Sequence, residues 1–157
     1  MKTLSALVLS IVAGFASVFG SSNLVLAATV FHHGSICHSL NANQENDLVI
    51  NTQEVQNIAT TTRRVICPLV VTHTPEQISG GVLVDYRTSV PFSTAITCTL
   101  YSYSYLGNFM GSKTSTSGFN NYISLLGVPA DIFSNHVVLC SLPPNSTGRL
   151  IGIESAF

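Results

Sequence analysis

The sequence has little charge of either sign and no tryptophan. Only 8% of its 157 residues are charged, with six Lys or Arg and seven Asp or Glu. Nucleic acids and anionic lipids are bound through clusters of basic side chains, so we expect neither as a partner. The lack of Trp also removes the largest aromatic side chain that could stack on a sugar ring.

The chain also lacks the pattern of an amphipathic helix after its first 27 residues. Ala, Leu, Glu and Lys are sparse there, whereas Val, Ile, Thr and Tyr are common and turn residues interrupt them at intervals of about ten. This composition predicts an all-β protein, a disulfide-bonded antiparallel β-sandwich of about eight strands. The expected strands are residues 55–62, 63–73, 80–90, 92–106, 108–116, 120–126, 135–143 and 149–157.

The first 27 residues have the order of a secretory signal peptide. Lys2 precedes an apolar run from Leu4 to Phe19, and small or compact residues follow up to Ala27. A membrane anchor is the alternative, but a spanning helix needs about 20 strongly apolar residues and this run is shorter. We therefore expect cleavage after Ala27, which leaves residues 28–157 as one domain, not inserted in a membrane, that is secreted or periplasmic in a bacterium.

Four cysteines follow the expected cleavage site, and an even number in an exported chain predicts two disulfides. Three pairings are open. We favour Cys37–Cys67 with Cys98–Cys140, because each bridge then stays within one half of the chain. Cys67, Cys98 and Cys140 each lie in phase with apolar neighbours at alternate positions, so we expect them to face the core.

The segment ITCTLYSYSYLGNF, residues 96–109, alternates between two kinds of residue. Ile96, Cys98 and Leu100 fall on one face of the expected strand, and the tyrosine stripe, Tyr101, Tyr103 and Tyr105, falls on the other. Aromatic rings on one sheet face can stack on sugar rings while their hydroxyls form hydrogen bonds. The stripe, together with Asn108 and Tyr122, is the candidate binding site, and packing under a loop or partner chain is its alternative.

The cysteine arrangement resembles that of small exported bacterial four-cysteine β proteins of unknown function. The shared features are an early Cys, a Cys-Pro pair at 67–68, a Cys on a Thr- and Tyr-rich strand and a late Cys-Ser-Leu-Pro-Pro at 140–144. The resemblance implies export and a β fold, and it implies no activity.

Other chemical patterns are weak. The histidines of HHGSICH, His32, His33 and His38, lie beside Cys37, whose sulfur we expect in a disulfide, and the calcium-like stretch NANQENDLVIN has only two carboxylates. We therefore expect no metal and no cofactor. No nucleophile elbow, zinc-binding helix or phosphate loop is present, and His73 and His136 lie near Asp85 and Asp131 only loosely in sequence, so we name no catalytic residue.

The leading hypothesis from sequence is a non-enzymatic structural or adhesive protein of the cell surface or extracellular matrix. It would associate with itself or with another surface protein, and the extended segment TVFHHG, residues 29–34, could add to a neighbour's sheet edge and be removable without unfolding the domain. The alternative is a carbohydrate-binding module that uses the tyrosine stripe on a polysaccharide, and the third hypothesis is a small secreted hydrolase.

Overall fold

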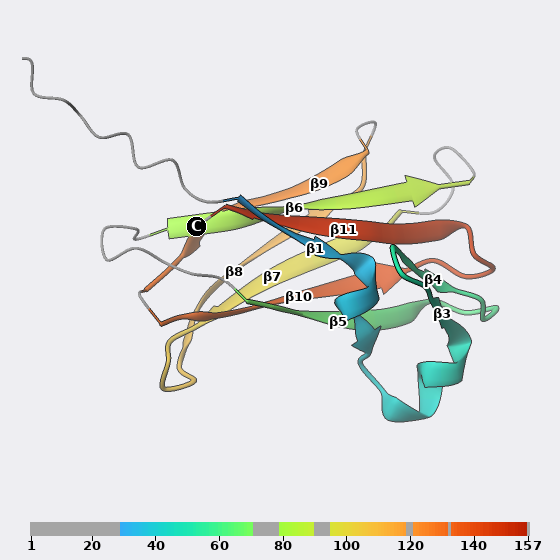
Figure 1. The fold of residues 1–157 in the computed structure, drawn as a ribbon, viewed down its shortest axis with the longest axis horizontal. Helices are drawn as coiled ribbons and strands as arrows, with labels where there is room; N and C mark the ends of the chain where they lie inside the picture. The colour runs from blue at the N-terminus through green and yellow to red at the C-terminus, as the bar shows by residue number, and fades with distance from the viewer. Residues whose placement is uncertain (1–28, 71–78, 90–94, 119–120, 132, 157) are drawn as a thin grey trace, which may run out of the picture.

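The alternating segments form two antiparallel sheets that pack face to face (Figure 1). The computed structural model describes residues 29–70, 79–89, 95–118, 121–131 and 133–156. Sheet A has the strand order β3-β4-β11-β6-β9. Strand β1 also pairs with β11, along residues 152–156, whereas β4 pairs with residues 149–150. Its strands are β1 (Thr29–His33), β3 (Leu48–Ile50), β4 (Val55–Asn57), β6 (Ser79–Thr88), β9 (Tyr122–Pro129) and β11 (Gly148–Ala156).

Sheet B has the order β2-β5-β10-β7-β8, and every neighbouring pair is antiparallel. Its strands are β2 (His38–Ser39), β5 (Arg63–Leu69), β7 (Thr97–Tyr103), β8 (Phe109–Thr116) and β10 (Asn135–Leu142). Two short 3-10 helices, η1 (Gly34–Ile36) and η2 (Ala42–Asp47), lie in the connections before β2 and β3. Within the described ranges, no helix is long and apolar enough to cross a membrane.

The all-β prediction is confirmed, but the described residues form eleven strands instead of about eight. The additional strands are β1, which the sequence shows only as an extended segment, and β2 and β3, which have two and three residues. Strands this short contain too little alternation to be recognised from sequence. The expected signal peptide, residues 1–27, lies outside the described residues.

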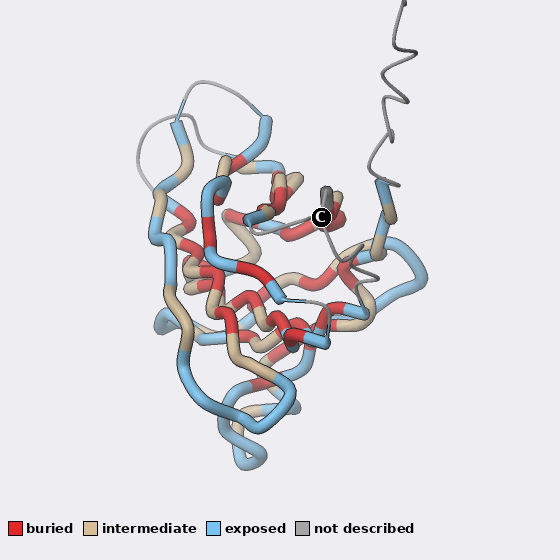
Figure 2. Tube along the Cα trace, turned by 90° about the vertical axis from the view of Figure 1, so that its left-hand side faces the viewer, coloured by how far each residue is buried: buried red, intermediate tan, exposed pale blue. Residues whose placement is uncertain are grey.

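The core lies between the inner faces of the two sheets, where Figure 2 shows the buried residues gathered. Alternate residues of β6, β9 and β11 point into it from sheet A, and alternate residues of β5, β7 and β10 meet them from sheet B. The expected inward phase of Ile96, Cys98 and Leu100 is confirmed, because all three have no exposed surface.

Both disulfides form as expected, Cys37–Cys67 and Cys98–Cys140. Cys98 and Cys140 are direct partners in the β7–β10 register, so this bridge joins neighbouring strands of sheet B and does not join the two sheets. All four cysteines are completely buried. Disulfides are typical of an oxidising compartment such as the periplasm or the extracellular space.

Candidate binding face

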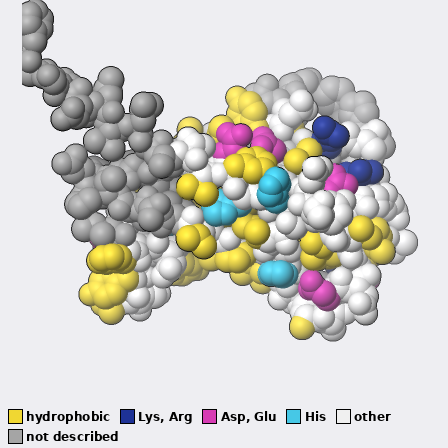
Figure 3. Space-filling view, viewed as in Figure 1, with side chains coloured by type: hydrophobic (Ala, Val, Ile, Leu, Met, Phe, Trp, Pro, Cys, Tyr) yellow, Lys and Arg dark blue, Asp and Glu magenta, His cyan; other side chains and the backbone are white. Residues whose placement is uncertain are grey.

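The outer faces of the two sheets differ in charge. On sheet A, the exposed or half-buried positions of β6 and β11 include Asp85, Arg87, Arg149 and Glu154. On sheet B, Arg64 of β5 is the only charged residue among the outward positions of the described strands. Figure 3 shows charged side chains over sheet A and a further acidic side chain at the lower right, while a hydrophobic group covers the β7–β8 hairpin at the lower left.

Three aromatic residues at the hairpin end of sheet B form what we call the aromatic platform, Tyr101, Tyr103 and Phe109. Tyr101 and Tyr103 are half-buried outward residues of β7, and Phe109 is 61% exposed at the start of β8. Tyr103 and Phe109 are register partners, and their ring centroids lie 5.9 Å apart with the planes at 63°. The platform therefore spans two strands, and Tyr103 and Phe109 are in ring contact within it.

A β-bulge brings Phe109 onto this face. Between Ser102 and Tyr103 the β7–β8 register shifts, so that Ser102 faces Gly111 while Tyr103 faces Phe109, and Met110 is the extra residue. Without this insertion, strict alternation from Ser112 would turn Met110 outward and Phe109 inward. Met110 instead lies toward the interior, where its sulfur is 4.0 Å from the hydroxyl oxygen of Ser102.

Hydrogen-bonding groups and aliphatic side chains surround the platform. Tyr101 has Val137 of β10 on one side and Ser112 of β8 on the other, and Tyr103 has the exposed Asn135 beside it. None of these neighbours carries a charge. The surface therefore combines ring faces for stacking with hydroxyl and amide groups for hydrogen bonds, which suits a ligand that is itself neutral and rich in hydroxyls.

Tyr105 of the tyrosine stripe lies beyond the strand, in the turn between β7 and β8. The turn is closed by the Gly107 N–H, which donates to the carbonyl of Ser104 at 2.8 Å, and Gly107 has the positive φ of 81° that favours glycine. Asn108 follows the turn and is exposed, and its backbone carbonyl accepts from the Ser104 N–H.

The ring of Tyr105 contacts a residue from a different connection. Its centroid is 6.4 Å from that of Phe133, which lies between β9 and β10. Tyr105, Leu106 and Phe133, which we call the tip cluster, are 62%, 69% and 70% exposed. The tip cluster extends the apolar surface past the end of the platform.

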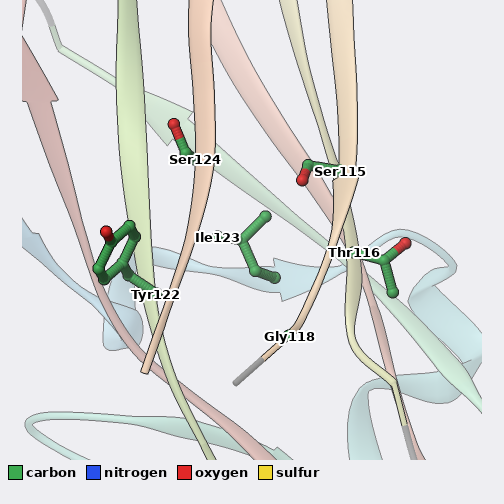
Figure 4. A pocket seen from close by; sticks show the side chains of 6 residues that line it. All are labelled: Ser115, Thr116, Gly118, Tyr122, Ile123 and Ser124. Atoms are coloured by element: carbon green, nitrogen blue, oxygen red, sulfur yellow. The ribbon is translucent and has the colours of Figure 1, made fainter. Parts of the chain in front are cut away.

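Tyr122 does not join the other expected site residues. It lies on β9 of sheet A, opposite Asp85, and is 45% exposed. It lines a pocket of about 210 Å³ between the edge strands β8 and β9, into which Ile123 points (Figure 4). The other lining residues are Ser115, Thr116, Gly118 and Ser124.

The histidines of HHGSICH separate in space. His33 packs edge-on against the ring of Phe31 at 5.1 Å, on the outer face of sheet A, and His38 is exposed on β2 of sheet B. His32 points toward the interior, and burial lowers its pKa while a backbone hydrogen bond at Val70 acts in the opposite direction. Across the described part of the chain, no group of three His, Cys, Asp or Glu residues is arranged to hold a metal ion.

The carboxylates of the NANQEND stretch have protein partners. Glu45 accepts from the backbone N–H of Ser39 at 3.1 Å, and Asp47 pairs with Arg63 at 2.6 Å. Of the residues noted for a hydrolase, His136 is 1% exposed inside the core, and His73 lies outside the described residues. A histidine so deeply buried offers no substrate access.

Sequence reasoning missed two aromatic residues at this end of the molecule. Because Phe109 closely follows the turn at Gly107, its pairing with Tyr103 in a hairpin could be proposed from sequence. The face of the sheet on which its side chain lies could not, because that depends on the bulge. Phe133 has no comparable signal, because its contact with Tyr105 joins two connections that are far apart in the chain.

No protein-family model matches the chain, and no curated protein sequence matches it. Among solved structures, it is similar to the C-terminal CBM6 of LamC, a marine laminarinase from Zobellia galactanivorans, with 14% identity and a TM-score of 0.39 over 83% of this chain and 100% of that one. It is also similar to the GH26-CBM35 β-(1,4)-mannanase of Podospora anserina, with 7% identity and a TM-score of 0.42, over 83% of this chain and 28% of that longer one. Similarities this distant do not transfer a ligand to this chain.

Proposed function

We propose that this chain is an exported bacterial carbohydrate-binding domain without catalytic activity, and that the aromatic platform is its binding face. The observation that carries the proposal is the uncharged outer face of β7, β8 and β10 in sheet B, on which Tyr101, Tyr103 and Phe109 lie together. Aromatic rings stack on the C–H faces of sugars, and tyrosine adds a hydroxyl at small entropic cost. We also propose that residues 1–27 direct export and that the chain is related to the small exported bacterial four-cysteine β proteins.

The leading sequence hypothesis, a structural or adhesive protein that associates with itself or with another surface protein, has less support. The extended segment that could add to a neighbour's sheet edge contains strand β1, which pairs along its whole length with β11 of the same chain. The long edge strand β8 carries Lys113, which pairs in register with the buried Leu100 but is itself exposed. A charged side chain at this position of an edge strand discourages pairing with the sheet edge of another molecule. An adhesive role would then arise through a bound polysaccharide.

Binding to immobilised polysaccharides tests the proposal. The panel contains the neutral polymers cellulose, β-mannan, xylan, chitin and β-1,3-glucan, with alginate as a charged comparison. We expect the oxidised protein to bind at least one neutral polymer and to ignore alginate. Phe109→Ala and Tyr103→Ala should each weaken binding roughly five- to thirtyfold, because one aromatic contact contributes on the order of 1–2 kcal/mol.

Tyr122→Ala is the matched control, since it removes an exposed aromatic ring from sheet A. Its binding should equal that of the unmodified protein, and melting temperatures should show that all variants are folded. Failure to bind any neutral polymer, or equal losses for Tyr122→Ala and Phe109→Ala, would overturn the proposal.

A further inference from the structure

A ladder of hydroxyl groups continues from the aromatic platform along β7 and β8. The outward residues beyond Tyr101 are Thr99 and Thr97 on β7, and those beyond Phe109 are Ser112, Thr114 and Thr116 on β8. The threonines form two cross-strand pairs, Thr97–Thr116 and Thr99–Thr114, with hydroxyl oxygens 3.0 and 2.9 Å apart. We call these four residues the threonine ladder.

The threonine ladder has hydrogen-bonding capacity to spare. Each hydroxyl has one donor and two acceptor positions, and each threonine pair uses one donor and one acceptor internally. Every pair therefore retains one O–H donor and several acceptor positions. Thr114 and Thr116 are exposed and Thr97 and Thr99 are half-buried, so a molecule lying on this face can reach all four side chains.

The shape of this surface favours an extended ligand. From Thr97 to Tyr103, β7 spans about 20 Å at the usual rise of an antiparallel strand, a length that several linked sugar rings would cover. The face carries no charged side chain along β7 or β8, because Lys113 belongs to the opposite phase. A β-1,4-linked chain is an extended ribbon with flat C–H faces and hydroxyls along its edges, whereas a helical or branched chain would touch this surface at one place only.

We propose that the aromatic platform and the threonine ladder form one continuous site for an extended, uncharged β-1,4-linked polysaccharide that lies along the β7–β8 hairpin. The inference rests on the proposed function and adds the ligand class and the direction of the chain. Stacking on the platform holds one part of the ribbon, and hydrogen bonds from the threonine ladder hold the sugars that follow.

Titration with cello-oligosaccharides and β-1,4-manno-oligosaccharides, from the disaccharide to the hexasaccharide, tests this site. Affinity for one of the two series should rise with length until the ladder is filled. The variant with Thr97, Thr99, Thr114 and Thr116 all changed to Val should bind the disaccharide as before and the hexasaccharide about tenfold more weakly. Valine keeps the branched shape and strand preference of threonine, and removing both partners of a hydrogen bond together is nearly neutral for folding.

Thr29 is an exposed threonine of sheet A, and Thr29→Val is the control. This variant should show the same rise of affinity with oligosaccharide length as the unmodified protein. If the fourfold variant does not fold, the pair Thr114→Val and Thr116→Val on the edge strand β8 replaces it.

Unchanged hexasaccharide affinity in the threonine variant, with binding lost in Phe109→Ala, would overturn this inference and leave the proposed function standing. Binding by the unmodified protein to β-1,3-glucan alone would overturn the ligand class, and an undiminished affinity in Phe109→Ala would overturn the proposed function itself.

Discussion

At the scale of single residues, Asn57 joins the two sheets at the end of the sandwich opposite the aromatic platform. Its side chain is completely buried, and its Nδ2 group donates to the carbonyls of Thr61, Leu142 and Pro143 at 2.8, 3.1 and 3.0 Å. Its Oδ1 atom accepts from the Ala59 N–H at 2.9 Å. No apolar side chain could satisfy this set of backbone groups.

Asn57→Ala should lower the free energy of unfolding by about 2–4 kcal/mol, because it leaves several buried backbone groups without partners. Asn57→Asp should lower it further, since a carboxylate would face three carbonyl oxygens and has no donor for them. Urea denaturation measures both changes, with the exposed Asn43→Ala as the control. A loss below about 1 kcal/mol for Asn57→Ala would contradict this role.

Asp85 on the outer face of sheet A predicts a dependence of stability on pH. Partial burial raises its pKa above the ordinary value of 3.8, and the nearby carboxylate of Glu154 raises it further. The folded state thus binds this proton more tightly than the unfolded state, so the contribution of Asp85 to stability is complete below about pH 3.8 and is lost as pH rises through the raised pKa.

Asp85→Asn should therefore raise the melting temperature at pH 7, and the gain should shrink on acidification and vanish near pH 3.8. Melting curves from pH 3 to 8 on both proteins measure the effect, and Glu154→Gln should give a smaller gain at pH 7. A gain that is constant across the whole range would show that the carboxylate of Asp85 is not its source.

At the scale of strands, β1 belongs to the fold of its own chain. All five of its residues pair with β11, and the hydroxyl of Ser155 donates to the carbonyl of Val30 at 3.1 Å. The ring of Phe31 lies against Gly152 so closely that any larger residue there would collide with it. The expectation that this segment can be removed without unfolding the domain stays a prediction, and the packing of β1 indicates that its removal costs stability.

Deletion of residues 28–33 should lower the free energy of unfolding by roughly 3 kcal/mol, through lost pairing and lost burial. It should also expose the edge of β11 and cause concentration-dependent self-association. Thermal melting and light scattering on a sizing column measure the two effects, and Thr29→Val serves as the control for a change in β1 that keeps the strand. A deletion variant that melts like the parent and stays monomeric would show that β1 is dispensable.

At the scale of the whole molecule, polarity divides between the two outer faces. Sheet A carries the charged residues of β6 and β11, including Arg149, whose Nη1 pairs with Glu54 at 3.0 Å. The outward positions of β7 and β8 on sheet B carry aromatic rings and hydroxyls instead. At one edge the sheets approach each other where Gly111 of β8 packs against Pro129 of β9, a contact that has no space for a side chain at position 111. This division of polarity leaves the outer face of β7, β8 and β10 as the uncharged surface available to a neutral ligand.

The sequence by itself determined the class of fold, the inward phase of the cysteines and the two faces of β7. These features depend on alternation along a single strand, which neighbouring residues fix because successive side chains point to opposite sides. The pairing of the cysteines was also reached from sequence, although as a choice among three arrangements.

Only the tertiary structure decided which strands share a sheet. It placed Tyr122 on sheet A, away from Tyr101 and Tyr103, and it brought Phe133 to Tyr105 from a distant connection. It also inserted the bulge at Met110 that turns Phe109 outward. Strand order, bulges and contacts between connections depend on how two sheets fit together, and no pattern within one strand records that fit.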